Sequence, residues 1–218
     1  MVNTLNTYFS SVFTQEQLNT FYGFQIRRQT LDTFNFRLED GQEKLNHLNV
    51  YNSTGPDLLY PRVLRTLEDL LCRPLNHIFN KSAGTGIIPA DRKPINVTAI
   101  HKKGNRQEPG NYRPICLTYV VCKTMERLIK VKIITHLEGN NLICDSQHGF
   151  RNKRSYLTSQ LDFFTHVIDT YDEGNIKAVD PIYQDFQKTF DKVAHERLLV
   201  KVMAYGIHGS AAQWIRNW

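Results

Sequence analysis

Apolar residues at helical spacing dominate this chain, and this pattern constrains its fold more than any other feature. An amphipathic helix repeats apolar residues at positions i, i+3, i+4 and i+7. The segments with this spacing are residues 4–13, 64–79, 118–138 and 155–172, with two shorter helices expected near 194–205 and 210–218. Strands are predicted only over residues 95–100, where apolar and polar residues alternate, and over about 176–186. The sequence therefore predicts a helix-rich α+β fold.

Proline and glycine indicate where these helices bend or end. Pro74 lacks a backbone donor and should kink or split the second helix. Gly84 and Gly86 are expected to end that helix and Gly174 the fourth, because glycine tolerates the left-handed conformation common at helix C-termini. In the fourth helix we expect one apolar face, Leu161, Phe164, Val167 and Ile168, to point into the core. We interpret the polar residues 14–54 as a loosely organised linker.

Positive charge is concentrated in one part of the chain. The whole sequence has 27 Lys and Arg residues against 21 Asp and Glu, a net charge of +6. Residues 92–154 contain 13 of the basic residues and 4 of the acidic ones, so this segment carries +9 and the rest −3. A concentrated basic segment suits a phosphate-rich partner, because each neutralised phosphate releases counterions. A solvated helix face followed by a charged loop would have the same composition, so both interpretations stay open.

Other features bear on the compartment. No apolar run approaches the length of about 18 residues that suggests a membrane span, and no basic residue precedes Arg27, as a secretory signal would require. The four cysteines, which form no C-x-x-C pair, are Cys72, Cys116, Cys122 and Cys144. We expect them to be reduced thiols rather than a disulfide framework or a zinc site. The sequence thus predicts an intracellular protein, cytoplasmic or nuclear, that is neither secreted nor bound to a membrane.

The segment YQDFQKTFD, residues 183–191, carries the clearest chemical signal. Asp185 falls at the end of the predicted strand, and polar residues typical of a turn follow it. A carboxylate there is well placed for Mg²⁺, which prefers oxygen ligands, and polymerases use two such ions in phosphoryl transfer. One aspartate cannot hold two ions, and taken alone Asp185 is also explained as a solvated or capping residue. Asp191 is expected to cap the helix that starts near Ala194.

An ordered series of motifs leads up to this segment. The motifs are GPD (55–57), IFNKS (78–82), IHKKG (100–104), PGNYRPICL (109–117), SQHGFR (146–151) and YQDFQKTFD (183–191). In this order they resemble the reverse transcriptase of a LINE-type, non-LTR retrotransposon, and the resemblance covers roughly the whole chain. It implies an RNA-directed DNA polymerase with a right-hand fold, of which this chain would hold the fingers and the first part of the palm, with an incomplete sheet. The implied division is an N-terminal helix and polar linker (1–54), a fingers-like region (55–175) and a partial palm (176–218).

The resemblance also implies roles for particular residues. Asp185 matches the first metal-binding aspartate of the palm. Lys102 and Arg113 match the finger residues that hold the phosphates of the incoming nucleotide, and Phe190 matches the bulky residue that stacks under its sugar and excludes ribonucleotides. The residues matching the motif that handles the template strand and the packing of fingers on palm are Gln147, Gly149, Phe150 and Arg151. The implied cofactor is Mg²⁺, and the implied partners are an RNA template, a DNA primer and deoxynucleoside triphosphates. Without the resemblance, Lys102 and Arg113 would be interpreted as solvated loop charges and Phe190 as a core residue.

Departures from the family pattern bear on activity. The next palm motifs, including a Tyr-x-Asp-Asp-type turn, and the thumb are not found before Trp218. Pro181 and Gln184 stand where the family has apolar residues, and Thr189 replaces the usual alanine; proline is rare in central strands. We therefore expect a fragment that has no polymerase activity by itself. The alternatives left open are a non-catalytic module that binds RNA or an RNA–DNA hybrid, and a truncated reading frame without a selected function.

Overall fold

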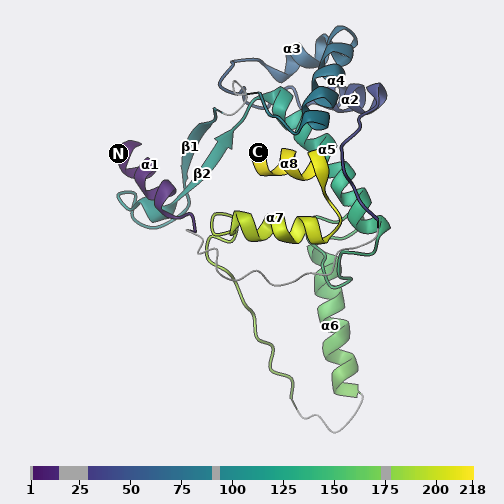
Figure 1. The fold of residues 1–218 in the computed structure, drawn as a ribbon. Helices are drawn as coiled ribbons and strands as arrows, with labels where there is room; N and C mark the ends of the chain where they lie inside the picture. Colours follow the sequence, from purple (N-terminus) through teal and green to yellow (C-terminus); the bar gives the residue numbers. More distant parts are fainter. Residues whose placement is uncertain (1, 15–28, 90–93, 173–177) are drawn as a thin grey trace. The chain divides into compact units, whose positions relative to one another are not determined.

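The computed structural model describes residues 2–14, 29–89, 94–172 and 178–218, and over these residues it confirms a helix-rich fold with a small two-stranded sheet (Figure 1). The helices are α1 (Val2–Ser11), α2 (Leu38–Asn46), α3 (Pro61–Thr66), α4 (Glu68–Thr85), α5 (Val120–Gly139), α6 (Tyr156–Asp172), α7 (His195–Ala204) and α8 (Gly209–Asn217). The strands are β1 (Asn96–His101) and β2 (Tyr112–Leu117), with a short 3-10 helix at Pro109–Asn111 between them. Within the described ranges, no helix combines the length and the apolar character needed to cross a lipid bilayer.

The chain divides into two compact units. Unit 1 consists of Met1–His136 together with Phe190–Trp218, and unit 2 consists of Leu137–Thr189. Unit 2 is therefore inserted, in sequence, between the two pieces that form unit 1. The predicted helices over 4–13, 118–138, 194–205 and 210–218 and the predicted strand over 95–100 are confirmed as α1, α5, α7, α8 and β1.

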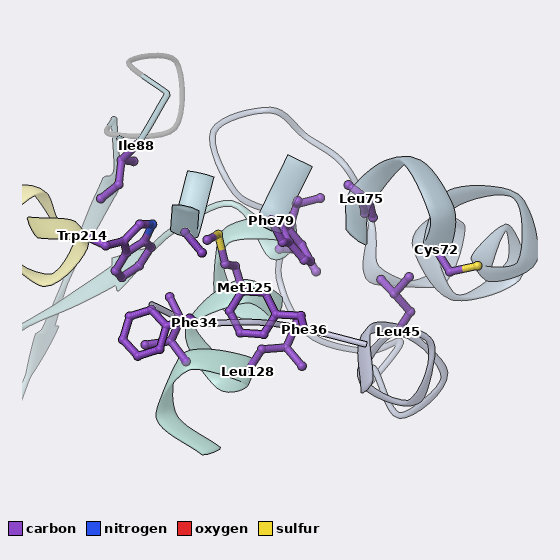
Figure 2. Close-up of a cluster of buried hydrophobic side chains, with 14 of the residues drawn as sticks. Phe34, Phe36, Leu45, Cys72, Leu75, Phe79, Ile88, Met125, Leu128 and Trp214 are labelled. Atoms are coloured by element: carbon purple, nitrogen blue, oxygen red, sulfur yellow. The ribbon is translucent and has the colours of Figure 1, made fainter. Parts of the chain in front are cut away.

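Unit 1 is built around one hydrophobic core (Figure 2). Helices α2, α4, α5 and α8 contribute most of its buried side chains, among them Leu45, Phe79, Leu128 and Trp214. Two polar side chains of this core, Trp214 and Ser82, are hydrogen-bonded. The Trp214 indole N–H donates to Ser82 Oγ at 3.1 Å, and the Ser82 hydroxyl donates to the Ile87 carbonyl oxygen at 2.7 Å. The first bond ties α8 to α4 and the second ties α4 to the residues that follow it, so burial leaves neither donor unsatisfied.

Residues 29–54 are part of this core, and the prediction of a loosely organised linker is wrong for them; residues 15–28 lie outside the described part. Phe34, Phe36 and Leu48 are buried beside Leu45 of α2, and the rings of Phe34 and Phe36 are 6.5 Å apart. At the start of α2, Asp40 accepts hydrogen bonds from the backbone N–H and from Nη2 of Arg37, which lowers the pKa of the Asp40 carboxyl. Sequence periodicity missed this region because its few apolar residues are spread over an extended segment and a short helix.

The segment before α2 is joined by backbone hydrogen bonds to the turn between α7 and α8. Leu31 and Ile207 form a parallel bridge, with the Leu31 N–H donating to the Gly206 carbonyl at 2.8 Å and the His208 N–H to the Leu31 carbonyl at 3.1 Å. The Asp32 carbonyl accepts bonds from the Ala211 N–H and the Ser210 hydroxyl, at 3.0 and 3.2 Å. The two pieces of unit 1 are thus connected by the main chain as well as by apolar packing.

Helix α4 runs through Pro74 without ending, so the predicted split at this proline is wrong. The break lies earlier, at Leu67, between α3 and α4. Pro74 and the residue four positions before it, Leu70, are both exposed, so the carbonyl that the proline leaves without a helical donor can be solvated. Gly86, with φ +67, forms the C-cap of α4 as predicted, whereas Gly84 lies inside the helix.

Unit 2 contains a loop after α5, helix α6, the irregular residues 178–186 and the beginning of a turn at 187–189. Helix α6 has no buried residue, and Leu161, Phe164 and Ile168 are each more than half exposed, so the prediction that they face a core is wrong. Residues 178–186 form no strand, which contradicts the strand predicted there; Gly174 and residues 176–177 fall outside the described residues. A strand needs a hydrogen-bonded neighbour, and the described part of unit 2 supplies none. The contact that this segment makes with α6 joins the rings of Tyr183 and Phe163, 5.8 Å apart.

Candidate functional site

Lys102 and Arg113 are both exposed and belong to the β1–β2 hairpin of unit 1, which Figure 1 draws as a pair of arrows. Arg113 pairs with Ile100 across the antiparallel ladder, and directly opposed residues point to the same face. The Lys102 N–H donates to the Asn111 carbonyl oxygen at 2.8 Å, so the pairing extends one residue beyond β1. Because side chains alternate along a strand, Lys102, two residues after Ile100, falls on the face that carries Arg113. The hairpin register therefore makes the two cations diagonal neighbours.

The loop that follows Lys102 is held in place by the next two motif residues. The Asn111 side-chain amide donates to the Asn105 carbonyl at 2.9 Å and to the Glu108 carboxylate at 3.2 Å. The Tyr112 hydroxyl donates to the Arg106 carbonyl at 2.9 Å, which closes the loop from its other side. These bonds fix the backbone of a loop rich in basic residues. Sequence reasoning did not assign β2, because prolines at 109 and 114 interrupt any alternating pattern.

Lys102 and Arg113 form no ion pair with an acid in the described ranges. Two exposed cations on one face repel each other in the absence of a counter-ion, and a phosphate group neutralises both through charge-assisted hydrogen bonds. Arg113 supplies a planar fork that suits two phosphate oxygens, and Lys102 supplies a more mobile point charge. The geometry thus suits an anion with several oxygens, such as a triphosphate.

The four residues of the SQHGFR motif that the resemblance relates to the template strand and to finger–palm packing lie in the loop between α5 and α6 in unit 2. The Cys144 carbonyl accepts the Gln147 N–H at 3.0 Å and Nη1 of Arg151 at 3.1 Å. Arg151 also lies within 3.8 Å of carboxylate oxygens of Glu138 and Asp145. Arg151 therefore folds inward and holds the loop together, and its charge is neutralised by two acids rather than presented on the surface.

Gly149 and Phe150, by contrast, lie on the outside of this loop. Phe150 is 75% exposed and has φ +61, a left-handed conformation that is rare for a residue with a bulky side chain. A Cβ atom placed on Gly149 would meet no atom within 4 Å. The loop therefore presents an aromatic ring next to an open stretch of backbone, an arrangement that could stack on a nucleobase while the chain approaches closely.

The thiol of Cys144 begins this loop and is exposed. Its sulfur lies 3.0 Å from the Ser146 hydroxyl, and hydrogen bonding from Ser146 lowers the pKa of the Cys144 thiol by stabilising the thiolate. Sequence analysis gave this cysteine no distinguishing feature, and the neighbouring serine is the one signal that could have indicated it.

Asp185 is exposed in the irregular segment of unit 2, and Phe190 lies 76% exposed in the turn that follows, at the start of the second piece of unit 1. The exposure of Phe190 contradicts its interpretation as a core residue. Asp191 does not cap α7, whose N-cap is Ala194 with no side-chain hydrogen bond. Over the described ranges, no three His, Cys, Asp or Glu residues gather closely enough to hold a metal ion. The described residues therefore do not by themselves supply the carboxylates of a two-magnesium centre.

Comparison with known proteins identifies the family. The family model described as "Reverse transcriptase (RNA-dependent DNA polymerase)" matches residues 100–218, which include the hairpin, the loop and Asp185. A probable RNA-directed DNA polymerase from transposon BS of Drosophila melanogaster is 27% identical over 203 residues, 92% of this chain and 22% of the relative. The RNA-directed DNA polymerase from the mobile element jockey of the same species is 32% identical over 165 residues, 75% of this chain and 18% of the relative.

A more distant relative is a Pol polyprotein from the type-1 retrotransposable element R2 of Popillia japonica, 23% identical over 130 residues, 60% of this chain and 17% of the relative. The chain spans about a fifth of the length of the curated relatives it matches. The order of motifs, the family match and these relatives agree, and the chain belongs to the reverse transcriptase family, among the RNA-directed DNA polymerases of non-LTR retrotransposons.

Proposed function

We propose that this chain is the part of an RNA-directed DNA polymerase that holds the incoming nucleotide and the template strand. The observation that carries this proposal is the placement of Lys102 and Arg113 on one exposed hairpin face, where they have no acidic partner among the described residues. Binding a triphosphate there would offset the repulsion between the two cations. Phosphoryl transfer depends mainly on positioning and on neutralising charge, which Lys and Arg side chains can provide.

The remaining residues have matching roles in this proposal. The exposed ring of Phe190 packs under the sugar of the nucleotide and disfavours a ribose 2′-hydroxyl. In the 144–155 loop, Gly149 and Phe150 contact the template, while Gln147 and Arg151 hold the loop in shape through their bonds to Cys144. RNA template, DNA primer and deoxynucleoside triphosphates are thus the proposed partners, and the basic segment 92–154 provides the charge for them.

In the right-hand arrangement that the family implies, residues 55–175 would form the fingers and residues 176–218 the first part of the palm. Residues 1–54 would precede the fingers, and their contribution to the core of unit 1 supports placing them in the same polymerase. We expect the protein to act inside the cell, in the cytoplasm or the nucleus, where RNA template and DNA target are available.

Nucleotide addition by this chain alone is not part of the proposal. Asp185 is the proposed contribution of this chain to a magnesium site, but a single exposed carboxylate cannot clamp two ions. We therefore propose that these residues bind template and nucleotide, and that chemistry requires carboxylates from outside the described residues. The proposal for the chain by itself therefore agrees with the alternative of a non-catalytic module that binds RNA or an RNA–DNA hybrid.

The first test measures triphosphate binding. Deoxythymidine triphosphate is titrated into the 218-residue chain in the presence of an RNA–DNA primer–template, and thymidine, which lacks phosphates, is the comparison ligand. Lys102→Ala and Arg113→Ala should each weaken triphosphate binding by about 3- to 10-fold and reduce its salt dependence. Lys81→Ala and Arg62→Ala remove equally exposed charges from α4 and α3 of the same unit and should have little effect. Equal losses in all four variants, or equal binding of thymidine, would contradict the assignment of the hairpin face.

The second test measures primer extension by the same chain with Mg²⁺. We expect no extension beyond background, and therefore no difference between the natural chain and Asp185→Asn. Extension that is abolished by Asp185→Asn would show that the chain completes a metal centre and would overturn the restriction to binding. A chain that binds neither the hybrid nor the triphosphate and aggregates on expression would instead support a truncated reading frame without a function.

A further inference from the structure

His148 lies in the middle of the SQHGFR motif, yet it differs from its neighbours in being buried. Its side chain is 6% exposed, whereas Gly149 and Phe150 next to it are open to solvent. The resemblance to reverse transcriptases assigns roles to the residues on either side of His148 and none to His148 itself. A buried imidazole in an exposed loop must be satisfied by particular partners, because an unpaired buried polar group is costly.

The partners of His148 are both on helix α6. Nδ1 lies 2.9 Å from the Thr158 hydroxyl oxygen, and Nε2 lies 3.5 Å from a carboxylate oxygen of Asp162. Thr158 and Asp162 are four residues apart, so they occupy the same face of the helix in successive turns. Thr158 also takes part in the N-terminal cap of α6, where its hydroxyl accepts the Ser155 N–H at 2.8 Å and lies 2.8 Å from the Ser155 carbonyl.

The positions of the protons follow from this arrangement. The Thr158 hydroxyl has one hydrogen, which goes either to the Ser155 carbonyl or to Nδ1. In the first case Nδ1 must itself donate, and in the second it accepts. Nε2 is fully buried and makes no conventional hydrogen bond, and a bare lone pair there would face the negative charge of Asp162. A proton on Nε2 removes this repulsion and is attracted to the carboxylate; in a neutral imidazole the lone pair is then on Nδ1, which accepts the hydrogen of the Thr158 hydroxyl.

We infer that His148 is the positioning residue of the template-contacting loop. Its imidazole fastens the loop to the first two turns of α6 through Thr158 and Asp162. Phe150, two residues later, is held in a left-handed conformation that persists only when the surroundings determine it. Arg151 of the loop pairs with Glu138 of α5 and with Asp145, and Arg154 also pairs with Asp145. Asp162 is the acid that lies beside His148. The template-binding consequence of this inference rests on the proposed function of the loop.

Hydrogen exchange of the loop amides in the 218-residue chain tests the positioning role without any nucleic acid. The natural protein is compared with His148→Leu, which keeps an apolar volume of similar size, and with His148→Asn, whose side-chain amide can take the place of Nδ1 beside Thr158. In His148→Leu the exchange of the loop amides, including that of Gln147, should rise at least tenfold. His148→Asn should restore half or more of the protection. The amides of α4 and α5 around Phe79 and Leu128 serve as the internal reference that the variants are folded.

A second hydrogen-exchange experiment uses the variant Asp162→Asn. Since Asp162 is inferred to act through His148, its substitution should raise loop exchange in the natural background and have no further effect in His148→Leu. Unchanged exchange in His148→Leu, no rescue by His148→Asn, or additive effects of the two substitutions would each overturn the positioning role.

Binding of an RNA–DNA hybrid then separates this inference from the proposed function. Loosening of the loop accompanied by weaker hybrid binding supports both. Loosening of the loop without any change in binding upholds the role of His148 and rejects the loop as a template contact.

Discussion

Helices α4 and α6 have similar amphipathic patterns but opposite environments. Phe79 of α4 is 3% exposed in the core of unit 1, whereas Phe164 of α6 is 57% exposed in unit 2. The difference does not lie in the helices themselves, since both formed where the spacing of apolar residues predicted them. It lies in their neighbours: α2 and α8 cover α4, and nothing among the described residues of unit 2 covers the apolar face of α6. Amphipathicity thus specifies a helix and its apolar face, and burial requires a second element.

The two units also differ in the residues that they contribute to the proposed function. The residues proposed to hold the nucleotide phosphates, Lys102 and Arg113, lie on a hairpin whose backbone pairing is complete. The residue proposed for metal chemistry, Asp185, lies in a segment that has no strand partner among the described residues. We expect unit 1 to carry most of the folding free energy of the chain and unit 2 to be easily perturbed.

The largest expected effect is on stability when phenylalanine is truncated in each unit. Phe79→Ala should lower the free energy of unfolding by about 3–5 kcal/mol, because it removes a buried ring and leaves a cavity. Phe164→Ala should cost less than about 1 kcal/mol, because that ring is already largely in water. Urea unfolding followed by circular dichroism, to which the helices of both units contribute, measures both. Similar losses would show that the α6 face is covered in solution and would remove the contrast between the units.

Two glycines allow the backbones of the two units to be compared. Gly206 has φ +88, and a Cβ atom there would overlap the Gln29 carbonyl oxygen, so Gly206→Ala should cost about 2–3 kcal/mol. Gly149→Ala adds its methyl group to open space and should change stability by less than about 0.5 kcal/mol. Thermal unfolding of the two variants gives the comparison. A tolerated alanine at 206 would mean that the bridge between Leu31 and Ile207 is not a fixed part of unit 1.

Cysteine labelling compares the units without altering their packing. Iodoacetamide should modify Cys144 of unit 2 quickly, while the buried Cys72 and Cys122 of unit 1 stay protected until the protein unfolds. Ser146 lowers the pKa of the Cys144 thiol, so a larger fraction is thiolate at a given pH and labelling persists to lower pH. In Ser146→Ala the labelling rate at pH 7 should fall several-fold, by about 3-fold or more. Mass spectrometry of the labelled peptides reads each site, and an unchanged rate in Ser146→Ala would refute the role of the serine.

The smallest expected effect concerns a glutamate that unit 1 partly buries. Burial raises the pKa of Glu126 in α5 above its ordinary value of 4.5. The folded state therefore resists ionisation of this group, a cost that is absent at pH values below 4.5 and present once the unfolded chain is ionised. Glu126→Gln should raise Tm at pH 7 by about 1 °C and have no such effect near pH 3.5. Glu39→Gln, which removes an exposed carboxylate from α2, should not raise Tm. A gain at both pH values would assign the effect to packing instead of charge.

The spacing of apolar residues and the positions of glycine predicted most of the helices. These sequence patterns failed where the structure depends on residues that are far away in the sequence. The spacing around Leu128 predicted α5, and Gly86 predicted the end of α4, because both depend on neighbouring residues alone. Phe34 and Phe36 gave no usable pattern, since their burial is decided by residues of α4, α5 and α8. The segment around Asp185 was predicted as a strand from its own composition, and it lacks the neighbour that a strand needs.

For the candidate site, the sequence supplied the residues and the structure supplied their relations. Lys102 and Arg113 could be named from the motif order, but their common face depends on the hairpin register, in which Ile100 opposes Arg113. Arg151 was expected to act in template handling and in the packing of fingers on palm, and the structure adds that its charge pairs with Glu138 and Asp145. His148 could not have been singled out, because its burial follows from contacts with α6 that no spacing rule describes.

The backbone bonds between Asp32 and the α7–α8 turn have a consequence for synthesis and folding. The partners Asp32 and Ser210 are 178 residues apart in the sequence, so closing this contact carries a large loop entropy, which grows with the logarithm of loop length. A high contact order of this kind slows folding. During translation, α2 through α5 leave the ribosome well before Trp214 exists to complete their core. Phe34, Phe79 and Met125 then lack the Trp214 side of their core for as long as unit 2 is being synthesised, so we expect a nascent chain to expose apolar surface until α8 emerges.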